Sequence, residues 1–169
     1  ACRSMGIPGR IYVPAATPKQ KRDRIKVHGG NMVELVVTGA NFDEASAAAH
    51  DYAEETGATI IEPFAARDTI VGQGTVAAEI LSQLSAMGKS PDTIVVPVGG
   101  GGLISGILSY LADMSPRTAV VGVEPAGAPS LNAALKAEKP VTLDAVDPFV
   151  DGAAVKRIGD INYQIIEKN

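Results

Sequence analysis

The sequence has no tryptophan, and aromatic residues make up only 4% of its 169 positions. A core built from it must consist mainly of alanine, valine, isoleucine and leucine, which suits helices layered on β-branched strands. The proportions of hydrophobic residues (46%) and charged residues (20%) are typical of a globular protein and exclude extended disorder. The length corresponds to about one domain on the usual range of roughly 100–200 residues.

Cysteine and histidine are also scarce. The single cysteine, Cys2, cannot form an internal disulfide, which indicates a reducing compartment and favours the cytoplasm. Neither His28 nor His50 has a second ligand at a typical metal-binding spacing, so no metal site is expected, and no Ser-His-Asp triad either. No apolar run approaches the roughly 20 residues that cross a bilayer, so no membrane partner is expected.

The net charge of −4 at pH 7 makes nucleic acid an unexpected partner. Basic residues gather only between Lys19 and Lys26, where no aromatic side chains alternate with them. This pattern favours the solvated face of a helix over a nucleic-acid patch.

The most informative feature that is present is a run of four glycines, Gly99 to Gly102. It follows the apolar run Thr93 to Val98 and precedes a helix-like run, Leu103 to Ala112. The first amides of a helix have no carbonyl partner within it, and the helix dipole places partial positive charge at the same end. Glycines let an anion approach such amides closely, so we expect a phosphate group to bind here. A tight turn without a ligand is the alternative.

Other phosphate-binding patterns fit this chain less well. The glycines do not satisfy the G-x-G-x-x-G spacing of dinucleotide-binding folds, although Glu124 lies at a distance that suits a ribose-binding acid. Gly88-Lys89-Ser90 fails as a Walker loop because Gln83 stands where its leading glycine should be. The spacing alone therefore does not exclude a nucleotide as the ligand.

The glycine run resembles the phosphate loop of pyridoxal phosphate (PLP) enzymes of the tryptophan synthase β type, also called fold type II. Other elements resemble threonine dehydratases and serine racemases and occur in the order of that family, and the opening is closest to biosynthetic threonine dehydratase. They are the opening Tyr12 to Lys21, Pro63-Phe64, Gly72-Gln73-Gly74-Thr75, Val123-Glu124-Pro125 and Asp151-Gly152-Ala153-Ala154-Val155.

The resemblance implies PLP as cofactor and an amino acid as substrate. It implies deamination of L-threonine, and of L-serine, to 2-oxobutanoate or pyruvate and ammonia, in isoleucine biosynthesis or threonine breakdown. It also implies a homo-oligomer, as a dimer or tetramer. Relatives that hold a cation place an acid where Ser130 stands, so no metal is predicted. The implied cofactor-binding residues are Gly99, Gly100, Gly101, Gly102 and the amide of Leu103, with Gly152 and Glu124 as weaker candidates.

The family carries its cofactor as a Schiff base on a lysine in a Ser-x-Lys segment, and no Ser-x-Lys occurs in this chain. We therefore expect no catalytic residue here, a catalytic domain incomplete at both ends, and a chain that is inactive alone. Serine racemase or another fold type II enzyme remains an alternative. A non-catalytic phosphate-ligand or assembly module is another.

Strand and helix patterns alternate along the chain, which predicts an α/β fold with parallel sheets and flanking helices. By resemblance, residues 1–62 form part of a small, mobile subdomain and residues 63–169 part of a large, cofactor-binding one. Thr17, Asn41 and Thr75 are expected as helix N-caps. Strands are expected at 10–14, 32–37, 58–62, 94–98 and 119–123, and helices from 18, 41, 75, 103, 130 and 159. Because residues 94–98 are continuously apolar, we expect this strand to be buried on both sides.

Overall fold

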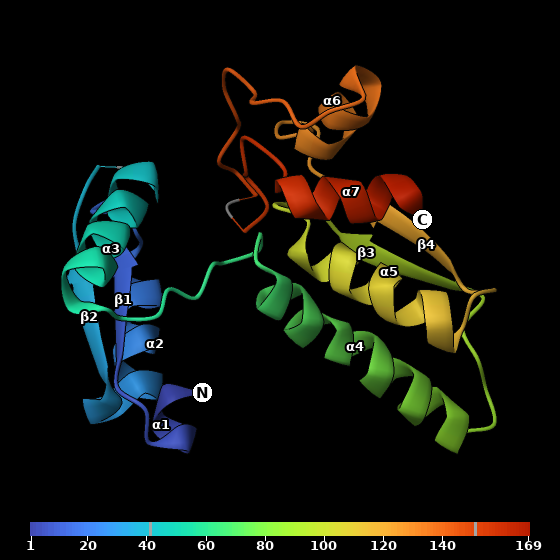
Figure 1. The fold of residues 1–169 in the computed structure, drawn as a ribbon, viewed down its shortest axis with the longest axis horizontal. Helices are drawn as coiled ribbons and strands as arrows, with labels where there is room; N and C mark the ends of the chain where they lie inside the picture. Colours follow the sequence, from blue (N-terminus) through green and yellow to red (C-terminus); the bar gives the residue numbers. More distant parts are fainter. Residues whose placement is uncertain (41, 151) are drawn as a thin grey trace. The chain divides into compact units, whose positions relative to one another are not determined.

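The computed structural model describes residues 1–40, 42–150 and 152–169. Its contacts divide the chain into two compact units, Ala1–Ile60 and Ile61–Asn169 (Figure 1). The division expected after Glu62 lies two residues beyond this one. Each unit is described by itself.

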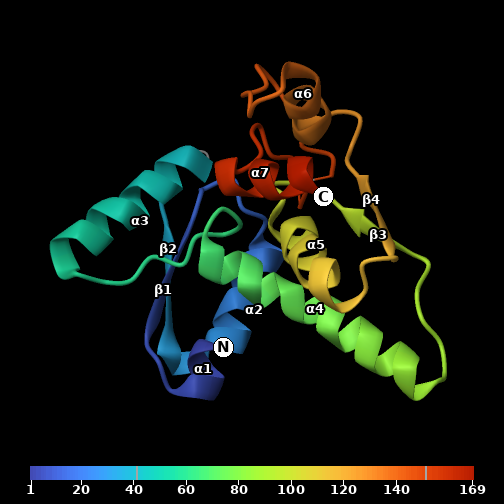
Figure 2. The same cartoon turned by 45° about the vertical axis from the view of Figure 1, so that its right-hand side comes forward.

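Unit 1 contains a two-stranded parallel sheet in which β1 (Gly9–Val13) pairs with β2 (Val33–Val37). Helix α1 (Cys2–Met5) precedes β1, and α2 (Lys19–Gly29) and the 3-10 turn η1 (Gly30–Met32) connect the two strands. Helix α3 (Phe42–Thr56) follows β2. The strands lie between α2 and α3 in both views (Figures 1 and 2).

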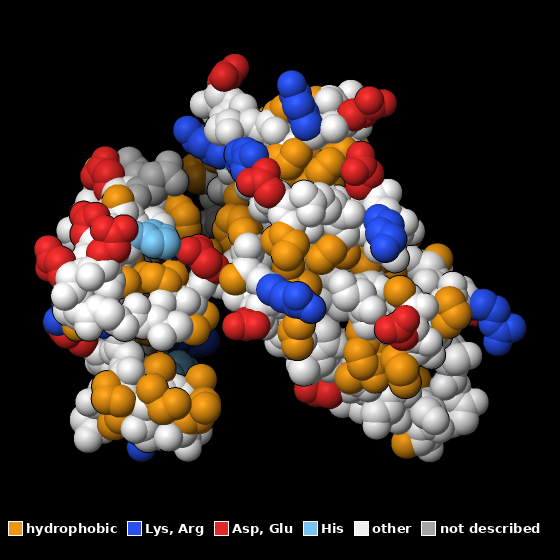
Figure 3. All heavy atoms as spheres, in the orientation of Figure 1, with side chains coloured by type: hydrophobic (Ala, Val, Ile, Leu, Met, Phe, Trp, Pro, Cys, Tyr) orange, Lys and Arg blue, Asp and Glu red, His pale blue; other side chains and the backbone are white. Residues whose placement is uncertain are grey.

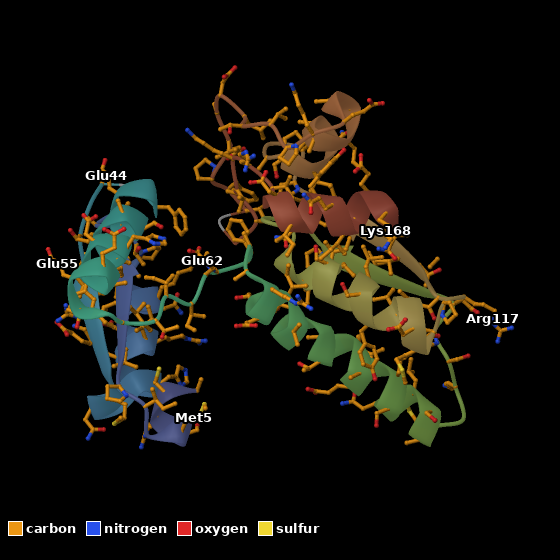
Figure 4. All side chains as sticks on the ribbon, in the orientation of Figure 1. Met5, Glu44, Glu55, Glu62, Arg117 and Lys168 are labelled. Atoms are coloured by element: carbon orange, nitrogen blue, oxygen red, sulfur yellow. The ribbon has the colours of Figure 1, made fainter. Side chains whose placement is uncertain are left out.

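Polar contacts on one side of unit 1 join its strands to α3. Arg10 forms an ion pair with Glu34 (2.6 Å) on the neighbouring strand, and its guanidinium lies 4.0 Å from the centre of the Tyr52 ring. Hydrogen bonds to Tyr12 and Glu34 raise the pKa of Arg10. Acidic side chains gather on α3 (Figure 3), where Glu44 and Glu55 project outward (Figure 4).

Unit 2 repeats the βα pattern around a second two-stranded parallel sheet. Strands β3 (Thr93–Pro97) and β4 (Ala119–Val123) pair along their whole length, with α5 (Gly102–Met114) between them in sequence. Helix α4 (Arg67–Ala86) precedes β3, and α6 (Ser130–Ala137) and α7 (Asp160–Lys168) follow β4. The two parallel sheets with flanking helices confirm the predicted fold class.

The core of unit 2 forms where α5 packs on the sheet and on two other helices. Ile107 of α5 and Val96 of β3 are almost completely buried, as is Ile158 just before α7. Helices α4 and α5 lie side by side (Figures 1 and 2) and approach most closely at two glycines, Gly74 and Gly106. A Cβ atom on Gly106 would lie 2.5 Å from the backbone nitrogen of Gly74, so the crossing leaves no room for a side chain there.

One face of the β3–β4 sheet is open, contrary to the sequence-based expectation that residues 94–98 would be buried on both sides. Val95 on β3 is 64% exposed and its partner Val121 on β4 is 47% exposed, whereas Val96, the next residue of β3, is buried. Among the described residues of unit 2, the helices pack on the face that carries Val96. The prediction that the apolar residues 94–98 are buried on both sides is therefore wrong for this chain.

Three other local predictions were also wrong. Residues 58–62 form no strand. Thr75 lies inside α4, which begins at Arg67, and its Oγ donates to the carbonyl of Gly72 instead of capping the helix. Helix α2 begins at Lys19, with Pro18 as its N-cap in place of Thr17. The expected cap Asn41 lies outside the described residues.

Helices α2 and α3 are each followed by a glycine with a positive φ. Gly30, with φ +58°, follows the last residue of α2, and Gly57, with φ +71°, follows α3. Glycine adopts such left-handed conformations without the steric penalty of a side chain.

No helix in the described part of the chain combines the length and apolar character that a membrane span requires.

Candidate functional site

The glycine run forms the turn between β3 and α5. The amide of Val98 donates to the carbonyl of Val123, which extends the pairing of the strands to the start of the run. Gly101 is the N-cap of α5 and adopts φ +90°, ψ 0°, a conformation open to glycine and strained for other residues. The run thus lies at the carboxyl ends of parallel strands, where open α/β sheets bind ligands.

The backbone amides of this turn form a run of free hydrogen-bond donors within the described part of the chain. Among the described residues, none of the six consecutive N–H groups from Gly99 to Ile104 donates to a backbone or side-chain oxygen. Gly100, Gly101 and Gly102 are nevertheless buried. Buried amides without partners are unfavourable, so the turn is suited to binding an acceptor that comes from outside the protein.

Protein atoms occupy the space that side chains would take at these glycines. A Cβ atom on Gly100 would lie 2.3 Å from the Phe64 ring, and one on Gly102 would lie 3.1 Å from Cα of Phe64. A Cβ atom on Gly99 would lie 3.1 Å from Cα of Ala153. Close packing against the protein therefore accounts for these glycines, a reason that the anion argument from sequence did not include.

The carbonyl oxygens of the turn are held on the side of α7. The carbonyl of Gly100 accepts hydrogen bonds from the Gly159 amide (3.2 Å) and from Nδ2 of Asn162 (2.7 Å). The same Nδ2 donates to the carbonyl of Phe64 (2.9 Å), and the carbonyl of Asn162 accepts from Oγ of Ser105 (3.3 Å). The first turn of α7 thus fixes the glycine turn from inside unit 2.

The structure brings three of the sequence elements together at the glycine turn. Phe64 packs on Gly100 and Gly102, and Ala153 and Val155 pack on Gly99. Gly152 itself is exposed and has no atom near its Cβ direction, and Asp151 lies outside the described residues. The placement of Gly152 beside the cofactor therefore stays a prediction.

The carboxylate of Glu124 accepts hydrogen bonds from backbone amides of α6. One carboxylate oxygen accepts from the Leu131 amide (2.9 Å) and the other from the Asn132 amide (2.7 Å), both in the first turn of α6. Glu124 is thus a carboxylate that caps the N-terminus of α6, and its role in cofactor binding stays a prediction. Ser130, on the same turn, is buried and its Oγ has no hydrogen-bond partner among the described residues.

The Gly72-Gln73-Gly74-Thr75 element has a packing role in this unit. It lies within α4, and Gly74 provides the close contact with Gly106 of α5. Gln73 is half-buried.

Two interactions of charged side chains involve residues of α7. Arg157 pairs with Asp160 (2.6 Å) in the first turn, and this hydrogen bond lowers the pKa of Asp160. Tyr163 donates to Glu167 (2.7 Å), and the carboxylate raises the pKa of Tyr163 to about 12. Within the described residues, no group of three His, Cys, Asp or Glu side chains is arranged to hold a metal.

Sequence reasoning did not identify Asn162 or the role of Phe64 at the turn. Their hydrogen bond joins residues 98 positions apart, so no local pattern announces it. The signal available in the sequence was an asparagine within the amphipathic run that forms α7.

Comparison with known proteins identifies the family of this chain. All residues 1–169 match the family described as pyridoxal-phosphate dependent enzyme, and the chain belongs to this family. The chain is 72% identical over 168 residues to the biosynthetic L-threonine dehydratase IlvA of Corynebacterium glutamicum. That match covers 99% of this chain and 38% of the relative.

Solved structures give the same result. The processed form of threonine deaminase isoform 2 from Solanum lycopersicum matches with a TM-score of 0.87 and 36% identity, over 98% of this chain and 46% of that one. Maize serine racemase matches with a TM-score of 0.87 and 32% identity, over 98% and 48%. The chain thus has the fold of type II PLP enzymes and spans about two fifths of the length of the curated relatives it matches.

Proposed function

We propose that the protein containing this chain deaminates L-threonine, and L-serine, to 2-oxobutanoate or pyruvate and ammonia, with PLP as cofactor. The observation that carries the proposal is the run of six unbonded amides at the start of α5, in a chain of the PLP-dependent family. The names of its relatives give the substrate: threonine dehydratases at 72%, 58% and 42% identity.

The residues of the turn fit the phosphate group of this cofactor. A phosphate dianion needs several converging donors, and the amides of Gly99 to Gly102 and Leu103 donate to no acceptor among the described residues. The positive end of the α5 dipole adds to the attraction. When bound, PLP supplies the electron-accepting ring that stabilises negative charge on the substrate α-carbon.

The contribution of this chain is binding and orientation. The glycine amides hold the phosphate, and Phe64 covers Gly100 and Gly102 on their other side and keeps water from the backbone there. Removal of the α-proton needs a base within hydrogen-bonding reach, which in this family is the cofactor-bearing lysine of the Ser-x-Lys segment. We therefore propose that unit 2 is part of the cofactor-binding subdomain, unit 1 part of the mobile one, and that residues 1–169 alone are inactive.

The test is made on the full-length protein, purified with PLP and assayed for 2-oxo acid and ammonia on a panel of L-threonine, L-serine and D-serine. We expect L-threonine to give the highest rate, with equal amounts of 2-oxobutanoate and ammonia. Residues 1–169 under the same conditions serve as a control and should release no ammonia. A full-length protein that binds PLP and releases neither product from any of these substrates would refute the proposal.

Serine racemase is the second candidate, because the maize enzyme shares the fold at 32% identity. The same panel separates the two activities, since a racemase converts L-serine to D-serine without stoichiometric loss of ammonia. Homo-oligomerisation and a cytoplasmic location remain predictions, which size-exclusion chromatography and cell fractionation would test.

A further inference from the structure

One buried polar side chain is not accounted for by the phosphate-binding amides themselves. Asn162, in the first turn of α7, is 0% exposed and donates from Nδ2 to the carbonyls of Gly100 and Phe64. Its Oδ1 has no partner among the described residues. The opposite amide orientation would set Oδ1 against two carbonyl oxygens, so the contacts determine which atom is the nitrogen.

The geometry of the peptide unit links Asn162 to the anion-binding side of the turn. A peptide is planar, and no cis bond occurs in the described part of the chain, so the N–H of Gly101 points opposite to the carbonyl of Gly100. Two donors from the start of α7, the Gly159 amide and Asn162 Nδ2, draw that carbonyl toward α7. They thereby direct the Gly101 amide away from α7.

We propose that Asn162 is a positioning residue that fixes the Gly100–Gly101 peptide so that its N–H faces the cofactor phosphate. This inference rests on the proposed PLP-dependent function.

The burial of Asn162 supports this role. A buried acceptor without a partner is unfavourable, and an apolar side chain at this position would avoid that penalty. The presence of a buried asparagine here therefore indicates a use for its two N–H groups. One of these N–H groups donates to the carbonyl of Phe64, whose ring covers Gly100. The same side chain therefore fixes both the Gly100 peptide and the residue that packs on it.

The test compares PLP with pyridoxal, which lacks the phosphate, in the full-length protein. Two variants are made: Asn162→Asp, which keeps the shape and replaces donors by an acceptor, and Asn162→Leu, which removes both hydrogen bonds. Tyr163→Phe is the matched control, because it removes a hydrogen bond from the next residue of α7 and leaves the turn untouched. Dissociation constants are measured by equilibrium dialysis, after circular dichroism has verified folding.

We expect both Asn162 variants to bind PLP about tenfold or more weakly. In these variants the Gly101 N–H is no longer directed at the phosphate, and about tenfold is the effect of losing one hydrogen bond to a charged group. Their affinity for pyridoxal should stay within about twofold of the parent, since the phosphate is the group that the turn binds. The control should match the parent for both compounds.

Each other outcome has a definite meaning. Failure of the parent protein to bind PLP would refute the proposed function. A parent that binds PLP, with variants that keep its affinity or lose both compounds equally, would refute the positioning role alone. Should neither variant fold, the Gly101 amide signal of the parent, labelled through its glycines, decides: a large shift on PLP binding is expected, and no shift overturns the inference.

Discussion

Replacing Gly106 by alanine tests the closest helix contact in unit 2. In the parent structure a Cβ atom at this position would lie 2.5 Å from the nitrogen of Gly74 and 2.5 Å from the carbonyl oxygen of Ile70. Both are backbone atoms of α4, which cannot swing aside as a flexible side chain can. Ordinary contacts of a Cβ atom begin at 3.4 Å, so α4 and α5 must separate by about 0.9 Å (3.4 − 2.5).

Two effects of opposite sign decide the magnitude. A gap of 0.5–1 Å forfeits about a quarter to a half of the attraction between the atoms it separates, and overpacking of this kind costs about 1–3 kcal/mol. Alanine favours the helical state over glycine by about 1 kcal/mol. Because the obstacle is backbone, we take the upper end of the first range, which leaves a net destabilisation of about 2 kcal/mol.

The assay is thermal unfolding of the full-length protein followed by circular dichroism. We expect Gly106→Ala to unfold about 4–8 °C below the parent. Gly72→Ala is the control, because Gly72 lies in α4 with no atom within 4 Å of its Cβ direction and should gain about 0.5–1 kcal/mol. Equal shifts for the two variants, or a Gly106→Ala protein as stable as the parent, would show that the helices do not meet at these glycines.

Three further predictions concern single interactions of unit 2. Glu167→Gln should lower the pKa of Tyr163 from about 12 toward 10, seen in the phenolate absorbance. Since folding raises this pKa, the Tyr163 interaction stabilises the parent below pH 10 and is lost between pH 10 and 12, so a variant with parent-like alkaline stability would contradict it. Glu124→Gln should destabilise the protein by about 1 kcal/mol in urea, because the start of α6 loses a charged acceptor; no change would deny that role. Residues 1–169 alone should bind the dye ANS through the open face of the β3–β4 sheet, and Val95→Thr with Val121→Thr should reduce its fluorescence; undiminished fluorescence would locate the dye elsewhere.

The sequence predicted the elements whose own residues determine them. The bounds of β4 and the start of α6 agree with the prediction, since each is an apolar segment that follows clear turn residues. The start of α4 was missed because residues 65–73 form a polar, irregular stretch, so the helix was expected only from Thr75, after Gly72 and Gly74. One of them is required by the crossing with α5, a tertiary contact that no local pattern contains.

The candidate site shows the same limit. The position of the glycine run before a helix was enough to predict unbonded amides, because helix starts leave them unbonded in any sequence. The surroundings of the run depend on residues far along the chain. Phe64 and Asn162 contact Gly100 because the packing of unit 2 brings together residues that lie far apart in the sequence.

The packing of the glycine run limits what mutation of the glycines themselves can show. Any side chain at Gly100 meets the Phe64 ring, and one at Gly101 meets Ile158 at 2.9 Å, so both changes would disturb the fold before they affect a ligand. Weaker PLP binding in such variants would therefore follow whether or not the amides bind the phosphate. Asn162 adds nothing to the side that faces the anion, and its replacement by aspartate keeps the volume of the core. A phosphate-specific loss of affinity at Asn162 would consequently separate anion binding from packing, which no glycine substitution in this run can do.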